Sequence, residues 1–243
     1  MPEITVAIFD LDDTLFAHRT AVRDGIAAHL AAVVPDADAA REQDRWDELE
    51  EQHYSRYLAG ELSYLGQRHA RVRDFMHPHG VAFELDTDAE KWFDTYLIEY
   101  RRAWTLYDDT LPCLDRLDDT GVRIGMITNG ILDFQMAKLD ALGLTNRIEH
   151  LVTSHEFGYA KPDARIFEHA VAQFGVEPGS AVYIGDRLAT DAMGAAAAGL
   201  TGVWLDRSGG ATAAEVAAAA GAGVRIIQSL AELPAVISYA ARE

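Results

Sequence analysis

The sequence contains a single cysteine, Cys113, among its 243 residues. One cysteine excludes an internal disulfide and any metal site built from several thiolates. The apolar stretches are also too short to span a bilayer, because Gly, Glu and Arg interrupt the alanine-rich runs near the C-terminus. The chain enters an apolar segment at once, with no basic leader or cleavable signal pattern. These absences favour a soluble cytoplasmic protein that does not contact membranes.

Positive charge is scarce as well. The 21 Lys and Arg residues face 39 Asp and Glu residues, which gives a formal net charge of −18. A broad nucleic-acid surface depends on clustered Lys and Arg, so the composition predicts no nucleic-acid partner. The same charge repels anionic substrates at long range, so a site for one needs its own local cation.

Apolar, β-branched runs recur along the chain at the spacing of a parallel sheet. Six of them predict strands, at 4–9, 122–128, 150–154, 181–185, 202–205 and 224–227. Segments with a helical period lie between them, at 111–121, 131–144 and 163–175. This alternation predicts an α/β fold: right-handed βαβ units in a doubly wound, Rossmann-like parallel sheet.

Residues 17–104 interrupt the alternation. This stretch has no strand-like run and is charged, aromatic and helical in its periodicity. The simplest interpretation is an α-helical domain, residues 17–104, inserted after the first strand. Residues 1–16 and 105–243 then form the core domain.

Three carboxylates follow the first strand, in the stretch ITVAIFDLDDTLF. Asp10 and Asp12 are two residues apart in extended backbone and point to the same side, at a strand end where open α/β sheets bind ligands. One carboxylate could act as a nucleophile, while the other passes a proton to the leaving group and later takes one from water. The alternative is that these acids cap the following turn or are solvated. We expect Asp13 to shape the exit turn.

Two further strand ends carry groups that complement these acids. The stretch ITNG places the Thr128 hydroxyl and the Asn129 and Gly130 amides at the start of a helix, where backbone N–H groups bind anions. Lys161, one of three lysines in the chain, follows the next strand. Taken singly, Asn-Gly is a common turn and a loop lysine is usually a solvated amine.

The fourth strand ends in Asp186, with Asp191 about one helical turn later. Alone, these two acids could simply favour a helix N-terminus. Together with Asp10 and Asp12, Asp186 supplies the hard oxygen ligands that suit Mg²⁺. Lys161 would offset the charge that a carboxylate nucleophile and a phosphate bring together. The four strand ends therefore predict a phosphoryl-transfer site.

In chain order, DLDDT, ITNG, KP and GDRLATD resemble the four motifs of the haloacid dehalogenase superfamily of hydrolases. The resemblance covers residues 1–16 and about 106–227, and the insert is placed like the superfamily's helical cap of the first type. It implies that Asp10 forms an aspartyl-phosphate and that Asp12 is the general acid and base. Thr128 and Lys161 would hold the phosphate.

The resemblance also implies a metal site. Asp186 would bind Mg²⁺ together with the Asp10 carboxylate and the Asp12 main-chain carbonyl. Asp191 would support Lys161 or the metal-bound water.

Asp12 bears on the type of reaction, because dehalogenating members of the superfamily lack this second aspartate. The motifs are similar to those of pyrimidine 5′-nucleotidases and N-acylneuraminate-9-phosphatases. We therefore expect a Mg²⁺-dependent phosphatase of small phosphorylated metabolites, such as nucleoside 5′-monophosphates, acting as a monomer or homodimer. The alternatives are a sugar phosphomutase and a catalytically idle protein that binds a phosphorylated ligand.

The fourth motif departs from the superfamily pattern at two positions. Arg187 stands where a small residue is usual, and Thr190 stands where Asn is usual.

The insert is expected to close over the site and to read the leaving group. Its polar candidates for that role are His18, Arg19, His53, Tyr57, Arg68 and Arg71. Each has a competing interpretation as a core or surface residue. Because Trp46, His53 and Tyr57 recur on one helix face, we interpret this stripe as packing.

Overall fold

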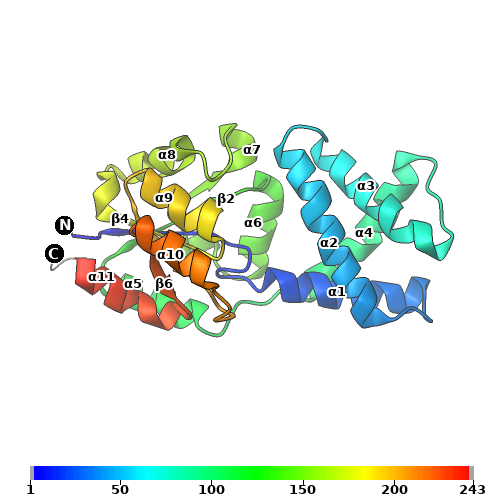
Figure 1. Cartoon of the computed structure of the whole chain (residues 1–243), viewed down its shortest axis with the longest axis horizontal. Coiled ribbons are helices and arrows are strands. Elements are labelled where there is room, and N and C mark those ends of the chain that lie inside the picture. The colour runs from blue at the N-terminus through cyan, green and yellow to red at the C-terminus, as the bar shows by residue number, and fades with distance from the viewer. Residues whose placement is uncertain (1–2, 241–243) are drawn as a thin grey trace. The chain divides into compact units, whose positions relative to one another are not determined.

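The structure is a computed structural model that describes residues 3–240, and the chain forms two compact units. His18–Thr105 makes up a helical unit, while the segment up to Ala17 and the segment from Leu106 onward make up an α/β unit. The helical unit therefore interrupts the α/β unit after its first strand (Figure 1). No helix within the described residues is long and apolar enough to cross a bilayer.

The α/β unit is built on a six-stranded sheet in which every pairing is parallel. The strands are β1 (Val6–Phe9), β2 (Arg123–Thr128), β3 (His150–Thr153), β4 (Ala181–Gly185), β5 (Thr201–Leu205) and β6 (Arg225–Ile227). Their order is β3-β2-β1-β4-β5-β6. All six predicted strands are confirmed. Since β2 pairs with one side of β1 and β4 with the other, the strand order reverses between β1 and β4.

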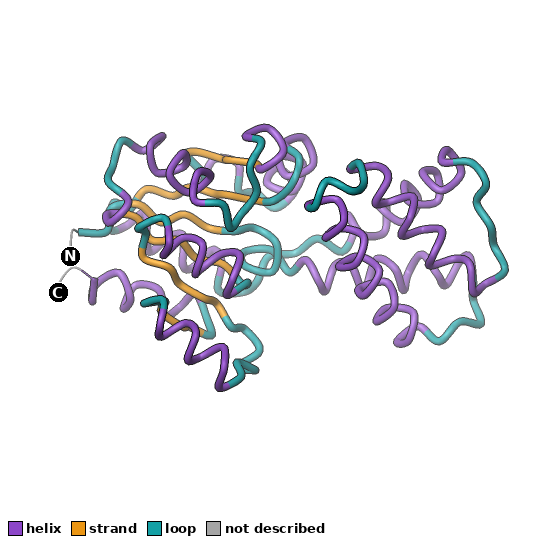
Figure 2. Tube along the Cα trace, turned by 45° about the horizontal axis from the view of Figure 1, so that its top comes forward, coloured by secondary structure: helices purple, strands orange, loops and turns teal. Residues whose placement is uncertain are grey.

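Helices lie on both sides of this sheet (Figure 2). They are α5 (Thr110–Asp119), α6 (Leu132–Ala141), α7 (Ser154–Phe157), α8 (Ala164–Phe174), α9 (Gly194–Ala197), α10 (Ala213–Gly221) and α11 (Leu233–Ala240). A π-helical segment, η4 (Leu188–Met193), precedes α9. The β1 and β4 side chains Ile8 and Tyr183 are fully buried against Phe167 and Phe174 of α8. The predicted doubly wound α/β fold is thus confirmed.

The helical unit packs around an aromatic centre. Its helices are α1 (His18–Val33), α2 (Ala39–Leu58), α3 (Tyr64–Met76) and α4 (Asp86–Arg102), with the short η1 (His77–His79) after α3. The Trp46 ring is fully buried and meets Phe75 and Tyr96 edge-on, at centroid distances of 4.8 and 4.9 Å. Pairs with this geometry stabilise a core beyond the apolar area they bury.

Two of the six polar candidates of the insert, His53 and Arg71, also contribute to this interior. His53 is buried, and its Nε2 lies 2.9 Å from the Asp74 carboxylate. Arg71 is buried as well, with its guanidinium 4.3 Å from the centre of the Trp46 ring and 2.9 Å from Glu50. Because Trp46 and His53 are buried and Tyr57 is half-buried, the interpretation of the stripe as packing is confirmed.

Candidate active site

The predicted acids lie where the strand order reverses. Asp10 follows β1 and Asp186 follows β4, and the two strands are neighbours in register, with Phe9 opposite Ile184. The Asp10 N–H donates to the Ile184 carbonyl at 2.9 Å, which extends the pairing to the start of the loop. Ligands of open α/β sheets bind at such a reversal, outside the carboxyl ends of the strands.

Lys161 places a positive charge beside Asp10 at this end of the strands. Its Nζ lies 2.6 Å from Asp10 Oδ1 and 2.7 Å from Asp191 Oδ1, and it donates to the Tyr183 hydroxyl at 2.7 Å. Burial alone would lower the pKa of Lys161, but the charges of Asp10 and Asp191 outweigh it and raise the pKa well above its usual value. The net acidic protein thus has a permanent positive charge beside Asp10.

A side chain of the loop after β2 holds the main chain of Lys161 in place. Asn129 accepts from the Lys161 N–H at 2.8 Å through Oδ1 and donates to the Lys161 carbonyl at 3.0 Å through Nδ2. The sequence predicts only an anion-binding role for Asn129. In the structure, these two hydrogen bonds also join the second motif to the third.

Asp191 sits behind Lys161 and reaches the loop after β4. Its Oδ2 accepts from the Arg187 N–H at 3.0 Å, while its other oxygen faces Lys161. A Cβ added at Gly185 would lie 2.4 Å from the Asp191 Cγ, so only glycine allows this close approach. Of the two roles considered for Asp191, the geometry favours the support of Lys161.

Asp12 has two partners that the sequence does not reveal. Lys138 Nζ donates to Asp12 Oδ1 at 2.5 Å, and Gln135 Nε2 donates to Asp12 Oδ2 at 3.2 Å. Gln135 also donates to the Thr128 hydroxyl at 2.8 Å. Gln135 and Lys138 are both buried and lie three residues apart on α6. The scarcity of lysine was the one signal available for Lys138.

The exit loop after Asp12 is held from several sides. Asp13 has a left-handed backbone, with φ of 61°, and its N–H donates to the Phe16 carbonyl at 2.8 Å. Its carboxylate accepts from the Tyr107 hydroxyl at 3.3 Å. Arg207 donates to the Thr14 carbonyl at 2.7 Å. These contacts agree with the expectation that Asp13 shapes the turn.

Asp10 and Asp186 have oxygens that the protein does not use. Within residues 3–240, Asp10 Oδ2 and the Asp186 carboxylate have no hydrogen bond or ion pair. Burial raises the pKa of Asp10 to about 7, with Lys161 opposing the effect. Burial, and next the charge of Asp10, raise the pKa of Asp186 to about 8. Two crowded carboxylates with free oxygens suit a hard divalent cation.

The donor set therefore fits Mg²⁺. No group of three or more His, Cys, Asp or Glu side chains is arranged to hold a metal in the described part of the chain. The Asp12 carboxylate is turned to Lys138, so Asp12 would contribute its main-chain carbonyl, beside the side chains of Asp10 and Asp186. A site with few protein ligands is normal for Mg²⁺, which keeps several waters.

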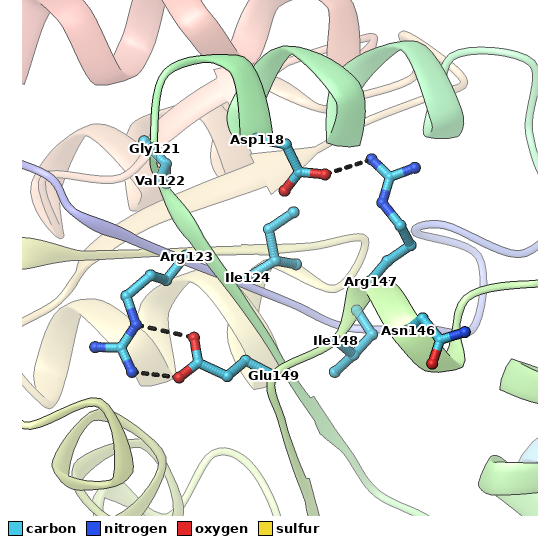
Figure 3. Close-up of a pocket in the computed structure, with 9 residues that line it drawn as sticks. All are labelled: Asp118, Gly121, Val122, Arg123, Ile124, Asn146, Arg147, Ile148 and Glu149. Carbon is cyan, nitrogen blue, oxygen red and sulfur yellow. Dashed lines mark hydrogen bonds and ion pairs between the residues drawn. The ribbon is translucent and has the colours of Figure 1, made fainter.

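A pocket of about 410 Å³ lies at the other edge of the sheet, around the starts of β2 and β3 (Figure 3). Its charged side chains pair with one another: Arg123 with Glu149, and Arg147 with Asp118 at 2.9 Å. It contains none of the predicted site residues, and its charges are neutralised within the protein. The predicted site residues lie at the opposite, carboxyl edge of the sheet.

Comparison with known families agrees with this geometry. Residues 4–199 match the family of haloacid dehalogenase-like hydrolases. The chain belongs to this family. The matched segment contains the helical unit, the α/β unit as far as residue 199, and all four motifs.

Curated relatives of this haloacid dehalogenase-like hydrolase are phosphatases. A glyceraldehyde 3-phosphate phosphatase of Methanopyrus kandleri is 30% identical over 84% of either chain. A ribulose-1,5-bisphosphate 5-phosphatase of Halopiger xanaduensis is 31% identical over 88% of this chain and 89% of its own. The pyrimidine 5′-nucleotidase YjjG of Escherichia coli is 29% identical over 62% of this chain and 64% of its own.

Solved structures share the fold. The hydrolase YfnB of Bacillus subtilis, a structure bound to magnesium, superposes with a TM-score of 0.80 at 17% identity. The match covers 98% of this chain and 100% of YfnB. At 17% identity, this likeness bears on the fold of the chain alone.

Proposed function

We propose that this protein is a Mg²⁺-dependent phosphomonoesterase of small phosphorylated metabolites, working through an aspartyl-phosphate at Asp10. One observation carries the proposal: Lys161 fixes one oxygen of the Asp10 carboxylate and leaves the other available for attack. Asp12, two residues on, places a proton-transfer group beside it. A dehalogenase has no need of this second acid, because halide leaves without a proton.

In the first step, Asp10 Oδ2 attacks phosphorus while the bond to the alcohol oxygen breaks. Asp12, in its protonated form, gives the leaving oxygen its proton. Lys161 and the Thr128 hydroxyl bind phosphoryl oxygens, which places positive charge where negative charge develops. When bound to Asp10, Asp186 and the Asp12 carbonyl, Mg²⁺ would neutralise the phosphate charge.

In the second step, water attacks phosphorus and the Asp10 carboxylate departs. Asp12, now a carboxylate, takes the proton from that water and returns to its starting form. Asp191 keeps Lys161 in place throughout, by the ion pair at 2.7 Å. The sum of both steps is an ester and water converted to an alcohol and inorganic phosphate.

Two substrate groups follow from the relatives. Glyceraldehyde 3-phosphate and ribulose bisphosphate are sugar phosphates, whereas YjjG acts on pyrimidine nucleotides. Similarity of the motifs to pyrimidine 5′-nucleotidases supports the second group, whereas similarity to N-acylneuraminate-9-phosphatases, whose substrate is a phosphorylated sugar acid, supports the first. We take both groups as candidates and assign leaving-group selection to the helical insert, residues 17–104.

The experiment is phosphate release from a panel of esters by purified protein, with Mg²⁺ or with a chelator. The panel contains sugar phosphates, nucleoside 5′-monophosphates and an aryl phosphate, and Asp10→Asn is the matched variant. We expect release that needs Mg²⁺ and falls by at least about 1000-fold in Asp10→Asn, which loses the nucleophile.

Other outcomes separate the alternatives. No release from any ester by folded, Mg²⁺-supplied protein would overturn the phosphatase proposal. Conversion of a sugar phosphate to its isomer without phosphate release would identify a phosphomutase instead. Binding of an ester that is neither hydrolysed nor isomerised would identify a ligand-binding protein.

A further inference from the structure

Lys138 is a buried cation that forms an ion pair with the Asp12 carboxylate. Its residue is 2% exposed, and its Nζ lies 2.5 Å from Asp12 Oδ1. The Phe16 and Phe134 rings flank it, with centroids 5.2 and 5.3 Å from Nζ. In the described part of the chain, Asp12 is the sole hydrogen-bonding partner of the Lys138 ammonium. Burying an ammonium is costly, so a lysine enclosed in this way is held for its carboxylate.

Gln135 holds the other oxygen of the same carboxylate. Its amide nitrogen donates to Asp12 Oδ2 and to the Thr128 hydroxyl, which uses both amide hydrogens. A Cβ at Gly130 would lie 2.5 Å from this nitrogen, so the glycine of the second motif makes room for Gln135. Both oxygens of Asp12 are thereby fixed from one helix, α6.

The amide oxygen of Gln135 is buried without a partner among residues 3–240. An unsatisfied buried acceptor costs about 1–3 kcal/mol. The side chain therefore keeps an orientation that serves Asp12 and Thr128 at a cost in stability. Such a cost is typical of groups that are placed for function.

We propose that Lys138 and Gln135 are positioning residues that aim the Asp12 carboxyl group at the oxygen of the leaving group. The inference rests on the proposed phosphatase function. Neither residue is assigned a contact with substrate. Their effect on catalysis passes through Asp12, so it should grow with the need of the leaving group for a proton.

The test compares kcat/KM for two substrates that differ in this need. p-Nitrophenyl phosphate releases a stable anion, whereas the best alkyl ester of the panel releases an alkoxide that needs a proton. Because kcat/KM reports the steps up to alcohol release, it isolates the step in which Asp12 acts as the acid. We expect Lys138→Met to lower kcat/KM for the alkyl ester by about 100-fold, and for the aryl ester by less than about threefold.

Two further variants sharpen the result. Gln135→Met should shift the ratio of the two substrates in the same direction, and it provides a second test if Lys138→Met fails to fold. In an Asp12→Asn background, Lys138→Met should change kcat/KM for the alkyl ester by less than about twofold, since the group it positions is gone. Lys91→Met, at a lysine whose side chain is 76% exposed, is the matched control and should leave both values unchanged.

Equal losses on both substrates, or full additivity with Asp12→Asn, would overturn the inference and leave the phosphatase function intact. Absence of phosphate release by the wild-type protein would overturn both. The two failures are distinguished by the wild-type measurement alone.

Discussion

Two of the three lysines are buried, and each lies beside an aspartate of the first motif. Lys161 pairs with Asp10 and Lys138 with Asp12, whereas Lys91 is exposed. In a chain with a net charge of −18, these two cations supply the local positive charge that an anionic substrate requires. At the residue scale, the negative charges of Asp10 and Asp12 are each balanced by a buried lysine.

Removal of Lys161 should therefore destabilise the fold as well as the site. Lys161→Met leaves Asp10 and Asp191 without their counter-ion, so we expect the free energy of unfolding to fall by about 3 kcal/mol. Urea unfolding of the metal-free protein at pH 7 measures it. Asp191→Asn in the same background should recover part of the loss, and Lys91→Met should change little. A loss below about 1 kcal/mol would show that the ion pairs contribute little to folding.

Residue types and spacing allow Asp10, Asp12, Lys161 and Asp186 to be predicted as site residues, because each follows a recognisable strand. Lys138 could not be assigned in this way. Its contact with Asp12 crosses 126 positions of sequence and depends on how α6 packs, which no local pattern encodes.

At the scale of elements, the carboxyl edge of the sheet brings the four motifs together. Buried β-branched runs predict the strands, and parallel pairing then places all the strand ends at one edge. The hydrogen bonds that join one loop to another cannot be predicted from such runs. Arg207, for example, reaches the Thr14 carbonyl across 193 positions, and its hydrogen bonds follow from packing rather than periodicity.

The Asp109 carboxylate accepts several such hydrogen bonds from distant segments. It accepts two bonds from Arg207, at 2.9 and 3.1 Å, and others from the Ser229 hydroxyl at 2.7 Å and the Leu230 N–H at 2.9 Å. Burial would raise the pKa of Asp109, but these hydrogen bonds outweigh it and hold the pKa below its usual value. The start of α5 is thereby joined to the loop after β5 and to the segment before α11.

The sign of the resulting pH dependence follows directly. A carboxyl with a lowered folded-state pKa stabilises the fold fully above its unfolded pKa of about 3.9, and this contribution is lost as pH falls through the folded pKa. We expect Asp109→Asn to lower the free energy of unfolding by about 2 kcal/mol at pH 7, and the difference from wild type to shrink below about pH 4. Denaturation at several pH values measures it, with the exposed Asp108→Asn as the control. A difference in the free energy of unfolding that stays constant with pH would contradict this account of the Asp109 hydrogen bonds.

At the scale of the whole molecule, the break in strand periodicity after residue 16 predicts an insertion, and the structure has a helical unit at that place. Sequence periodicity also shows that Trp46 and His53 are core residues of that unit. The substrate is not encoded in any such pattern, because a fold shared by many activities does not specify which molecule is bound.

The balance of charge over the whole protein leads to a prediction about metal binding. Mg²⁺ at Asp10 and Asp186 should stabilise the native state, by about 2.7 kcal/mol at 100 times its Kd. We expect the melting temperature of the wild-type protein to rise on titration with Mg²⁺, compared with NaCl at equal ionic strength. Asp186→Asn should abolish most of this rise. An equal rise in the variant would mean that Mg²⁺ acts by general screening of the acidic surface.

The most direct test of the central claim is to trap the covalent intermediate. Protein turning over a ³²P-labelled ester with Mg²⁺ is quenched in acid, and the label is located by peptide mapping. The account predicts label on the peptide that contains Asp10, bound as an acid-stable, base-labile acyl phosphate, and none in Asp10→Asn. Turnover with label on another peptide, or with no labelled protein at any quench time while Asp10→Asn remains active, would contradict it.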